Sequence, residues 1–177
     1  TQYLLRRTQP QGGLQAGDYV LFHAAAGGVG LIACQWARAM GLQLIGTAGS
    51  DEKCALALSQ GATFAINYTR EDFVARVKEI TGGKGVKVVY DSVGHTTFEN
   101  SLKCLAPRGI LASFGESSGD PPPVAARQLG NMGSLFVTHP SLIDYTATRA
   151  DLPVTLDHLA LDLRRRAYGI RELVRRM

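Results

Sequence analysis

A chain of 177 residues is of the usual size for one well-buried domain, and its 45% hydrophobic and 19% charged residues are typical of a globular protein. These proportions exclude a disordered chain, and no apolar run reaches the roughly 18 residues that a membrane-spanning helix needs. The net charge of +4 is modest and by itself indicates no nucleic-acid partner.

Short apolar runs alternate with longer helical patterns along most of the chain, which predicts βαβ units. Glycines fall just past three of the expected helices, where a left-handed cap residue is favoured. The fold class is therefore α/β, a doubly wound parallel sheet (Rossmann fold) of about six strands with helices on both faces. We expect strands at 19–24, 42–48, 64–67, 86–92, 109–114 and 135–138, and helices at 28–40, 51–60, 71–80 and 97–105.

The turn after the first expected strand carries the most specific motif. Ala25-x-Gly27-x-x-Gly30 fits the dinucleotide fingerprint G-x-G-x-x-G with alanine in its first position. Small residues allow a sharp reversal and a close approach of the backbone to two phosphates, and the following helix directs its amides at the anion. The alternative is an ordinary strand-to-helix turn, but the flanking strand and helix favour a pyrophosphate site.

The end of the second expected strand bears on the choice between NAD and NADP. An NAD site usually has an acidic residue there, which binds the ribose 2′-hydroxyl, whereas this strand ends Ala48-Gly49-Ser50. Ser50 and Lys53 could instead bind a 2′-phosphate. Asp51 is the evidence against this interpretation, although Ser50-Asp51-Glu52 is also a natural helix start. The sequence favours NADP.

Two further strand ends fall on the same edge of the predicted sheet, at 91–94 and 113–115, where they could contact the ribose and nicotinamide. For Asp91 we favour a structural role as a helix cap over proton transfer, and for His23 a place in the core. The catalytic residues stay unknown, because no nucleophile or paired carboxylates can be recognised. Hydride transfer requires none, since the cofactor carries the reactive hydride.

Two other segments and the cysteines limit the interpretation further. Pro121, Pro122 and Pro123 exclude a central strand, so 116–134 is expected to be a loop, either functional or merely connecting. Residues 151–177 read as a basic helical segment whose arginines lack an aromatic platform for nucleic acid. The three cysteines are far apart and suggest no disulfide framework and no metal site, which fits a reducing cytoplasm.

From about residue 3 to residue 149, the chain resembles the nucleotide-binding domain of NADPH-dependent quinone oxidoreductases, the zeta-crystallin-like, zinc-independent medium-chain dehydrogenases/reductases. The resemblance is carried by Phe22-His23-Ala24-Ala25-Ala26-Gly27-Gly28-Val29-Gly30, Ile45-Gly46-Thr47-Ala48-Gly49, Ile66-Asn67-Tyr68, Val89-Tyr90-Asp91-Ser92-Val93-Gly94 and Ser113-Phe114-Gly115 with Ser117-Ser118-Gly119. It implies an NADPH (NADP) site in domain 1–150, and 151–177 departs from the family pattern.

The resemblance also assigns roles to single residues. Residues 26–29 would touch the pyrophosphate, Gly49, Lys53 and Tyr68 the 2′-phosphate, and residues near Val93 the ribose and nicotinamide. The full set of expected cofactor-binding residues is Ala26, Gly27, Gly28, Val29, Gly49, Ser50, Lys53, Tyr68, Ser92, Val93, Phe114, Gly115, Ser117 and Thr138.

The family implies a quinone acceptor in the complete enzyme and a homodimer formed through the sheet edge near Leu135 to Thr138. We expect the family's GroES-like catalytic domain to be absent from this chain. Two alternatives therefore stay open: a non-catalytic NADPH-binding module from a truncated or spliced form, and a related reductase that acts on enones.

Overall fold

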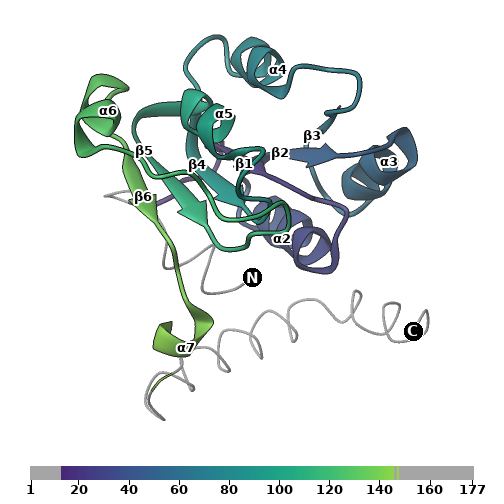
Figure 1. The fold of residues 1–177 in the computed structure, drawn as a ribbon. Coiled ribbons are helices and arrows are strands. Elements are labelled where there is room, and N and C mark those ends of the chain that lie inside the picture. Colours follow the sequence, from purple (N-terminus) through teal and green to yellow (C-terminus); the bar gives the residue numbers. More distant parts are fainter. Residues whose placement is uncertain (1–12, 146, 148–177) are drawn as a thin grey trace. The chain divides into compact units, whose positions relative to one another are not determined.

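Six parallel strands form one sheet in the order β3-β2-β1-β4-β5-β6 (Figure 1). The computed structural model describes residues 13–145 and 147. Residues 13–140 lie in one compact unit, and the short helix α7 (Leu142–Tyr145) belongs to a second unit. The strands are β1 (Tyr19–Phe22), β2 (Gln43–Ala48), β3 (Phe64–Asn67), β4 (Val86–Asp91), β5 (Leu105–Ser113) and β6 (Phe136–Thr138).

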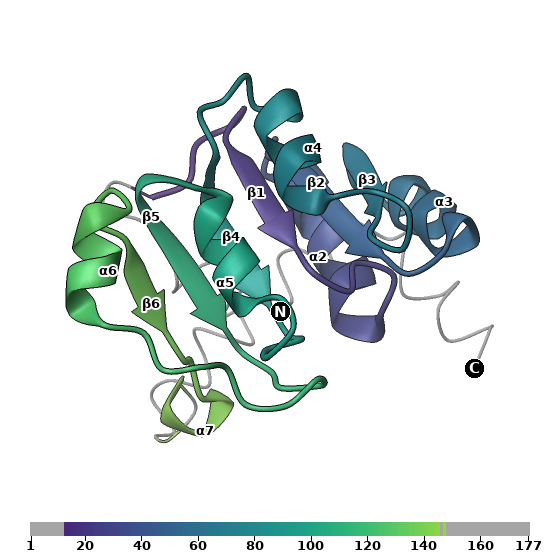
Figure 2. The ribbon, with the colours of Figure 1, turned by 45° about the horizontal axis from the view of Figure 1, so that its top comes forward.

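Helices cover both faces of this sheet, as Figure 2 also shows. They are α2 (Gly28–Ala39), α3 (Asp51–Ser59), α4 (Phe73–Ile80), α5 (Phe98–Lys103) and α6 (Ala126–Asn131). Successive strand residues point to opposite faces, so Phe22 packs with Trp36 of α2 and Leu21 packs with Leu102 of α5 in two separate cores. Burial on both faces explains why the strands read as continuous apolar runs.

The sheet order confirms the predicted doubly wound fold, and the strand order reverses beside β1. From β1 the chain winds outward to β2 and β3, and it then returns to the other side of β1 for β4, β5 and β6. Ligands of such sheets bind at the carboxyl ends of the strands beside this reversal.

Several predicted boundaries were wrong. The first strand ends at Phe22, because Ala24 has a left-handed φ of 52° that starts the turn. The predicted helix at 97–105 ends at Lys103. Strand β5 begins at Leu105, earlier than expected, because Leu105 already pairs with Val86 of β4; the register then shifts before Ile110 pairs with Val88. The region 116–134 is not wholly a loop, since it contains α6.

The predicted basic segment 151–177 lies outside the described residues. None of the helices in the described part of the chain is both long and apolar enough to span a bilayer.

Candidate functional site

The expected cofactor residues come together at one edge of the sheet, at the carboxyl ends of the strands. Residues 26–29 follow β1, and Gly49 and Ser50 follow β2 just ahead of Lys53 in α3. Tyr68 is the first residue after β3. Ser92 and Val93 follow β4, the segment from Phe114 to Ser117 follows β5, and Thr138 is the last residue of β6.

The turn after β1 is built by close backbone contacts. The amide of Gly27 donates to the carbonyl of Ala24 at 2.9 Å, which closes the reversal. A Cβ atom on Gly30 would lie 2.5 Å from the carbonyl oxygen of Ala25, so this position requires glycine. A Cβ on Gly28 would meet nothing within 4 Å. The protein itself therefore leaves room at Gly28, where helix α2 begins. The first amides of a helix have no partner within the helix itself.

This turn fits a dinucleotide pyrophosphate. Helix α2 has no acidic residue in its first turn that would compete with an anion. Its N-terminal dipole and backbone amides favour negative charge. The space at Gly28 is the feature that a phosphate oxygen would fill.

At the outer end of the edge, Ser50 caps α3. Its hydroxyl oxygen accepts from the Lys53 amide at 3.3 Å. The hydroxyl also hydrogen-bonds Glu52, which lowers the pKa of that carboxyl. Tyr68 is 55% exposed and its hydroxyl lies 2.7 Å from the position of a Cβ on Gly49. The Lys53 ammonium has no ion-pair partner among the residues that the structure describes.

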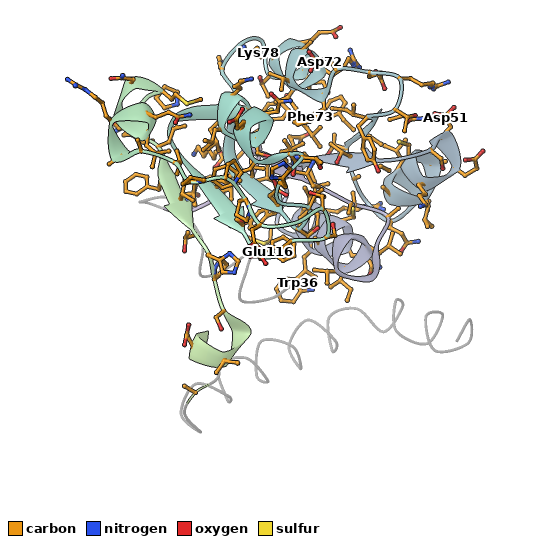
Figure 3. The ribbon with its side chains drawn as sticks, in the orientation of Figure 1. Trp36, Asp51, Asp72, Phe73, Lys78 and Glu116 are labelled. Atoms are coloured by element: carbon orange, nitrogen blue, oxygen red, sulfur yellow. The ribbon has the colours of Figure 1, made fainter. Side chains whose placement is uncertain are left out.

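Asp51, the evidence against NADP in the sequence, is already engaged. Its Oδ1 accepts from Arg70 Nη2 and from Asn67 Nδ2, each at 2.7 Å. Figure 3 shows Asp51 at the start of α3. Sequence reasoning missed Arg70, because its only signal is a basic residue shortly after β3.

Near the middle of the edge, at the end of β4 beside β1, the carboxylate of Asp91 organises the chain that follows. It is fully buried, and its Oδ1 accepts from the amides of Val93 at 2.8 Å and Gly94 at 3.1 Å. The Thr97 and Ser101 hydroxyls donate to it at 2.8–2.9 Å. Asp91 is therefore structural, as expected, but the predicted helix cap is wrong, because the N-cap of α5 is Thr97 and Asp91 instead binds the amides of the loop that carries Val93.

The segment after β5 is tied to that same loop. The amide of Ser118 donates to the Val93 carbonyl at 2.8 Å, and the Ser118 hydroxyl donates to it at 2.7 Å. The amide of His95 donates to the Gly119 carbonyl at 3.0 Å. Residues 116–119 are therefore fixed against the loop that carries Val93. These bonds do not decide between a functional and a merely connecting segment.

His23 is buried in a polar chain beneath this edge. Its Nε2 lies 2.9 Å from the Ser101 hydroxyl, and its Nδ1 lies 2.9 Å from the Thr47 hydroxyl. Because Ser101 donates its one proton to Asp91, its oxygen must accept from His23. Nε2 therefore carries a proton. Because burial lowers the pKa of His23, the ring is neutral at neutral pH, and Thr47 donates to Nδ1. The predicted core position of His23 is confirmed.

The neutral state gives a pH prediction. Burial lowers the pKa of His23 below its usual 6.5, against a smaller opposite effect of Asp91. The unfolded chain then takes up this proton at a higher pH than the folded chain. The free energy of unfolding should be fully supported above about pH 6.5 and should fall as the pH drops below it.

Urea unfolding of the wild type and of His23→Gln at pH 7.5 and pH 5 measures this effect. The variant should lose part of the pH dependence, whereas the control His95→Gln, at an exposed histidine, should keep it. An unchanged pH dependence in His23→Gln would contradict the assignment.

No group of three or more metal-binding side chains forms within the described residues. Cys34, Cys54 and Cys104 are buried and free. Burial raises the pKa of Cys34 to about 11 and that of Cys104 to about 12, so both stay thiols at neutral pH. A thiol is a poor metal ligand and a poor nucleophile. The described residues therefore do not fit a zinc centre.

The sheet order and the glycine turn at its reversal define a dinucleotide-binding domain of the Rossmann type. The family model for "Zinc-binding dehydrogenase" matches residues 28–160, and the chain belongs to this family. Within it, the chain corresponds to the NAD(P)-binding domain of the quinone oxidoreductases.

Known proteins of this family are close to the chain. It is 56% identical over 150 residues to quinone oxidoreductase 1 of Escherichia coli, covering 85% of this chain and 45% of that protein. It is 48% identical over 152 residues to the 2-haloacrylate reductase of a Burkholderia species, covering 85% and 45%. The chain thus spans about half the length of the curated relatives it matches.

A solved structure of a related protein has the same fold over most of this chain. The crystal structure of Escherichia coli quinone oxidoreductase complexed with NADPH superimposes with a TM-score of 0.83 at 54% identity. The superposition covers 89% of this chain and 47% of that one.

Proposed function

We propose that the chain binds NADPH along the carboxyl edge of its sheet and serves as the cofactor-binding domain, about residues 1–150, of an enzyme that reduces quinones. The observation that carries the proposal is the open position at Gly28 beside the first amides of α2. The solved relative that contains NADPH supports the choice of cofactor. When bound, the nicotinamide supplies a hydride to the acceptor.

Different residues of this edge bind different parts of the cofactor. Residues 26–29 hold the pyrophosphate, and Gly49, Ser50, Lys53 and Tyr68 surround the 2′-phosphate. The wall made by Ser92, Val93, Phe114, Gly115 and Ser117, with Thr138 beyond it, faces the ribose and nicotinamide. Phe114 packs its ring 5.7 Å from that of Phe22, which fixes this wall to the core.

Lys53 gives the sharpest test of the 2′-phosphate site. Lys53→Ala should weaken NADPH about tenfold or more, because a hydrogen bond to a charged group is lost, and should change NADH less than about twofold. Fluorescence titration with both cofactors measures the two affinities. The control is Lys84→Ala, since Lys84 is exposed and precedes β4 at the opposite edge of the sheet. Equal losses for NADPH and NADH would remove Lys53 from the phosphate site.

A second candidate is a reductase for activated alkenes, the enone class, because the chain is also 48% identical to a 2-haloacrylate reductase. A third candidate is a non-catalytic module that binds NADPH. Oxidation of NADPH in the presence of phenanthrenequinone or of an enone separates these functions. Binding without turnover of either acceptor would favour the module.

We further place the complete protein in the cytoplasm, with no resident metal, as a homodimer. The three buried free thiols agree with a reducing compartment. Strand β6 is the last strand of the sheet, and Phe136 is 59% exposed on it. Such an edge invites pairing with a second copy.

A further inference from the structure

The carboxylate of Asp51 lies close in sequence to Ser50 and Lys53 of the proposed 2′-phosphate site. Asp51 is the first residue of α3, two positions before Lys53, and its side chain is 57% exposed. An unpaired carboxylate there would repel the phosphate of NADPH and could accept from the ribose 2′-hydroxyl of NADH. What holds Asp51 therefore bears directly on the choice of cofactor.

Two donors hold Asp51, one at the end of β3 and one in the chain just after it. Asn67 is almost fully buried at the end of β3, and its Oδ1 accepts from the Thr69 amide at 3.1 Å and the Thr69 hydroxyl at 2.7 Å. This fixes the orientation of the amide group, so Asn67 Nδ2 points at Asp51 Oδ1, 2.7 Å away. Arg70 adds a guanidinium at 2.7 Å from the same oxygen.

The carboxylates of Asp51 and Glu71, near the end of β3, are each paired with an arginine, whereas Lys53 forms no ion pair within the part of the chain that the structure describes. The carboxylate of Glu71 is already paired, since its Oε2 lies 3.2 Å from Arg76 Nε. Its Oε1 accepts from the backbone amide of Asn67. Arg70 is then the cation opposite Asp51, and Lys53 stands without an ion-pair partner among the described residues. The pair of Asp51 and Arg70 contributes no net charge, which leaves the positive charge of Lys53 available to a phosphate.

We propose that Arg70 is a specificity-determining residue for NADPH. By pairing with Asp51 it neutralises the carboxylate beside the 2′-phosphate and holds it away from the ribose. This inference rests on the proposed NADPH site. Arg70 is 65% exposed, and an exposed ion pair adds little to fold stability. Its loss should therefore affect the selectivity between cofactors more than the fold.

The test measures dissociation constants for NADPH and NADH with the full chain. Arg70→Ala should weaken NADPH about fivefold and leave NADH unchanged or slightly tighter, because the carboxylate at residue 51 becomes unpaired. Arg70→Lys should retain most of the selectivity. In the Arg70→Ala background, Asp51→Ala should restore NADPH affinity, because the repelling charge is gone. The loss should also shrink at high salt, where exposed charges are screened.

Controls separate this inference from the proposed function. Arg127→Ala removes an exposed arginine on α6, far along the chain from this site, and should change neither affinity. A wild type that binds neither cofactor would overturn the proposed function and the inference together. A wild type that binds NADPH, with equal losses for both cofactors in Arg70→Ala, would overturn the inference alone. Weaker NADH binding by Asp51→Asn would show that Asp51 accepts from the ribose 2′-hydroxyl, and this result would also overturn the inference.

Discussion

Gly28→Ala should fold as well as the wild type and yet bind NADPH at least about tenfold more weakly. The new Cβ meets no protein atom within 4 Å, so it costs no packing, and alanine favours a helix over glycine by up to about 1 kcal/mol. The same methyl group would occupy the space beside the first amides of α2. A lost hydrogen bond to the charged pyrophosphate is of the size needed for a tenfold effect.

Gly30→Ala is the matched variant two residues along the same helix. Its Cβ would lie 2.5 Å and 2.6 Å from the carbonyl oxygens of Ala25 and Ala24, which belong to the backbone and cannot rotate away. We expect a loss of about 3 kcal/mol in the free energy of unfolding. Urea unfolding and NADPH titration of both variants separate the two effects. Normal NADPH binding by Gly28→Ala would contradict the pyrophosphate assignment, and weak folding of this variant would contradict the open space at Gly28.

Asp91→Ala should be the most damaging substitution at the end of the central strand β4. It leaves the amides of Val93 and Gly94 and the hydroxyls of Thr97 and Ser101 without their buried acceptor. Buried unpaired groups cost about 1–3 kcal/mol each, and we expect a total loss of about 3–5 kcal/mol. Urea unfolding measures it, with Asp120→Ala at an exposed aspartate as the control.

Asp91→Asn should lose much less than Asp91→Ala. The asparagine oxygen can still accept from Val93 and Gly94, and its NH₂ group can donate to Ser101. Ser101 would then donate to His23 Nε2, and His23 would carry its proton on Nδ1 and donate to Thr47. Equal losses in the two variants would show that the buried chain cannot reverse its donors in this way.

The sequence was most informative where a local pattern determines the structure. The Ser50-Asp51-Glu52 start of α3 was predicted because the capping hydroxyl and its partner amide are three residues apart. The inner strands β1, β2 and β4 were predicted because both of their faces are buried and apolar. The cofactor residues came from a resemblance carried by motifs that all lie at strand ends.

The missed features depend on contacts between distant residues or on weak patterns. Helix α6 buries none of its residues, so its sequence carries no helical pattern of apolar side chains. The pairing of Arg70 with Asp51 joins residues 19 positions apart and depends on how the loop after β3 folds back on α3. The left-handed Ala24 has no sequence signal either, since glycine would be the usual residue there.

The reversal of strand order beside β1 has a consequence for how the domain tolerates change. In doubly wound sheets, the crevice that takes a long ligand arises where the chain leaves the central strand in two directions, not from the detailed course of any one loop. Loops at the ends of the outer strands can therefore vary in length and composition between related domains while the crevice persists. Substrate preference can diverge in such a lineage without rebuilding the place where the cofactor lies.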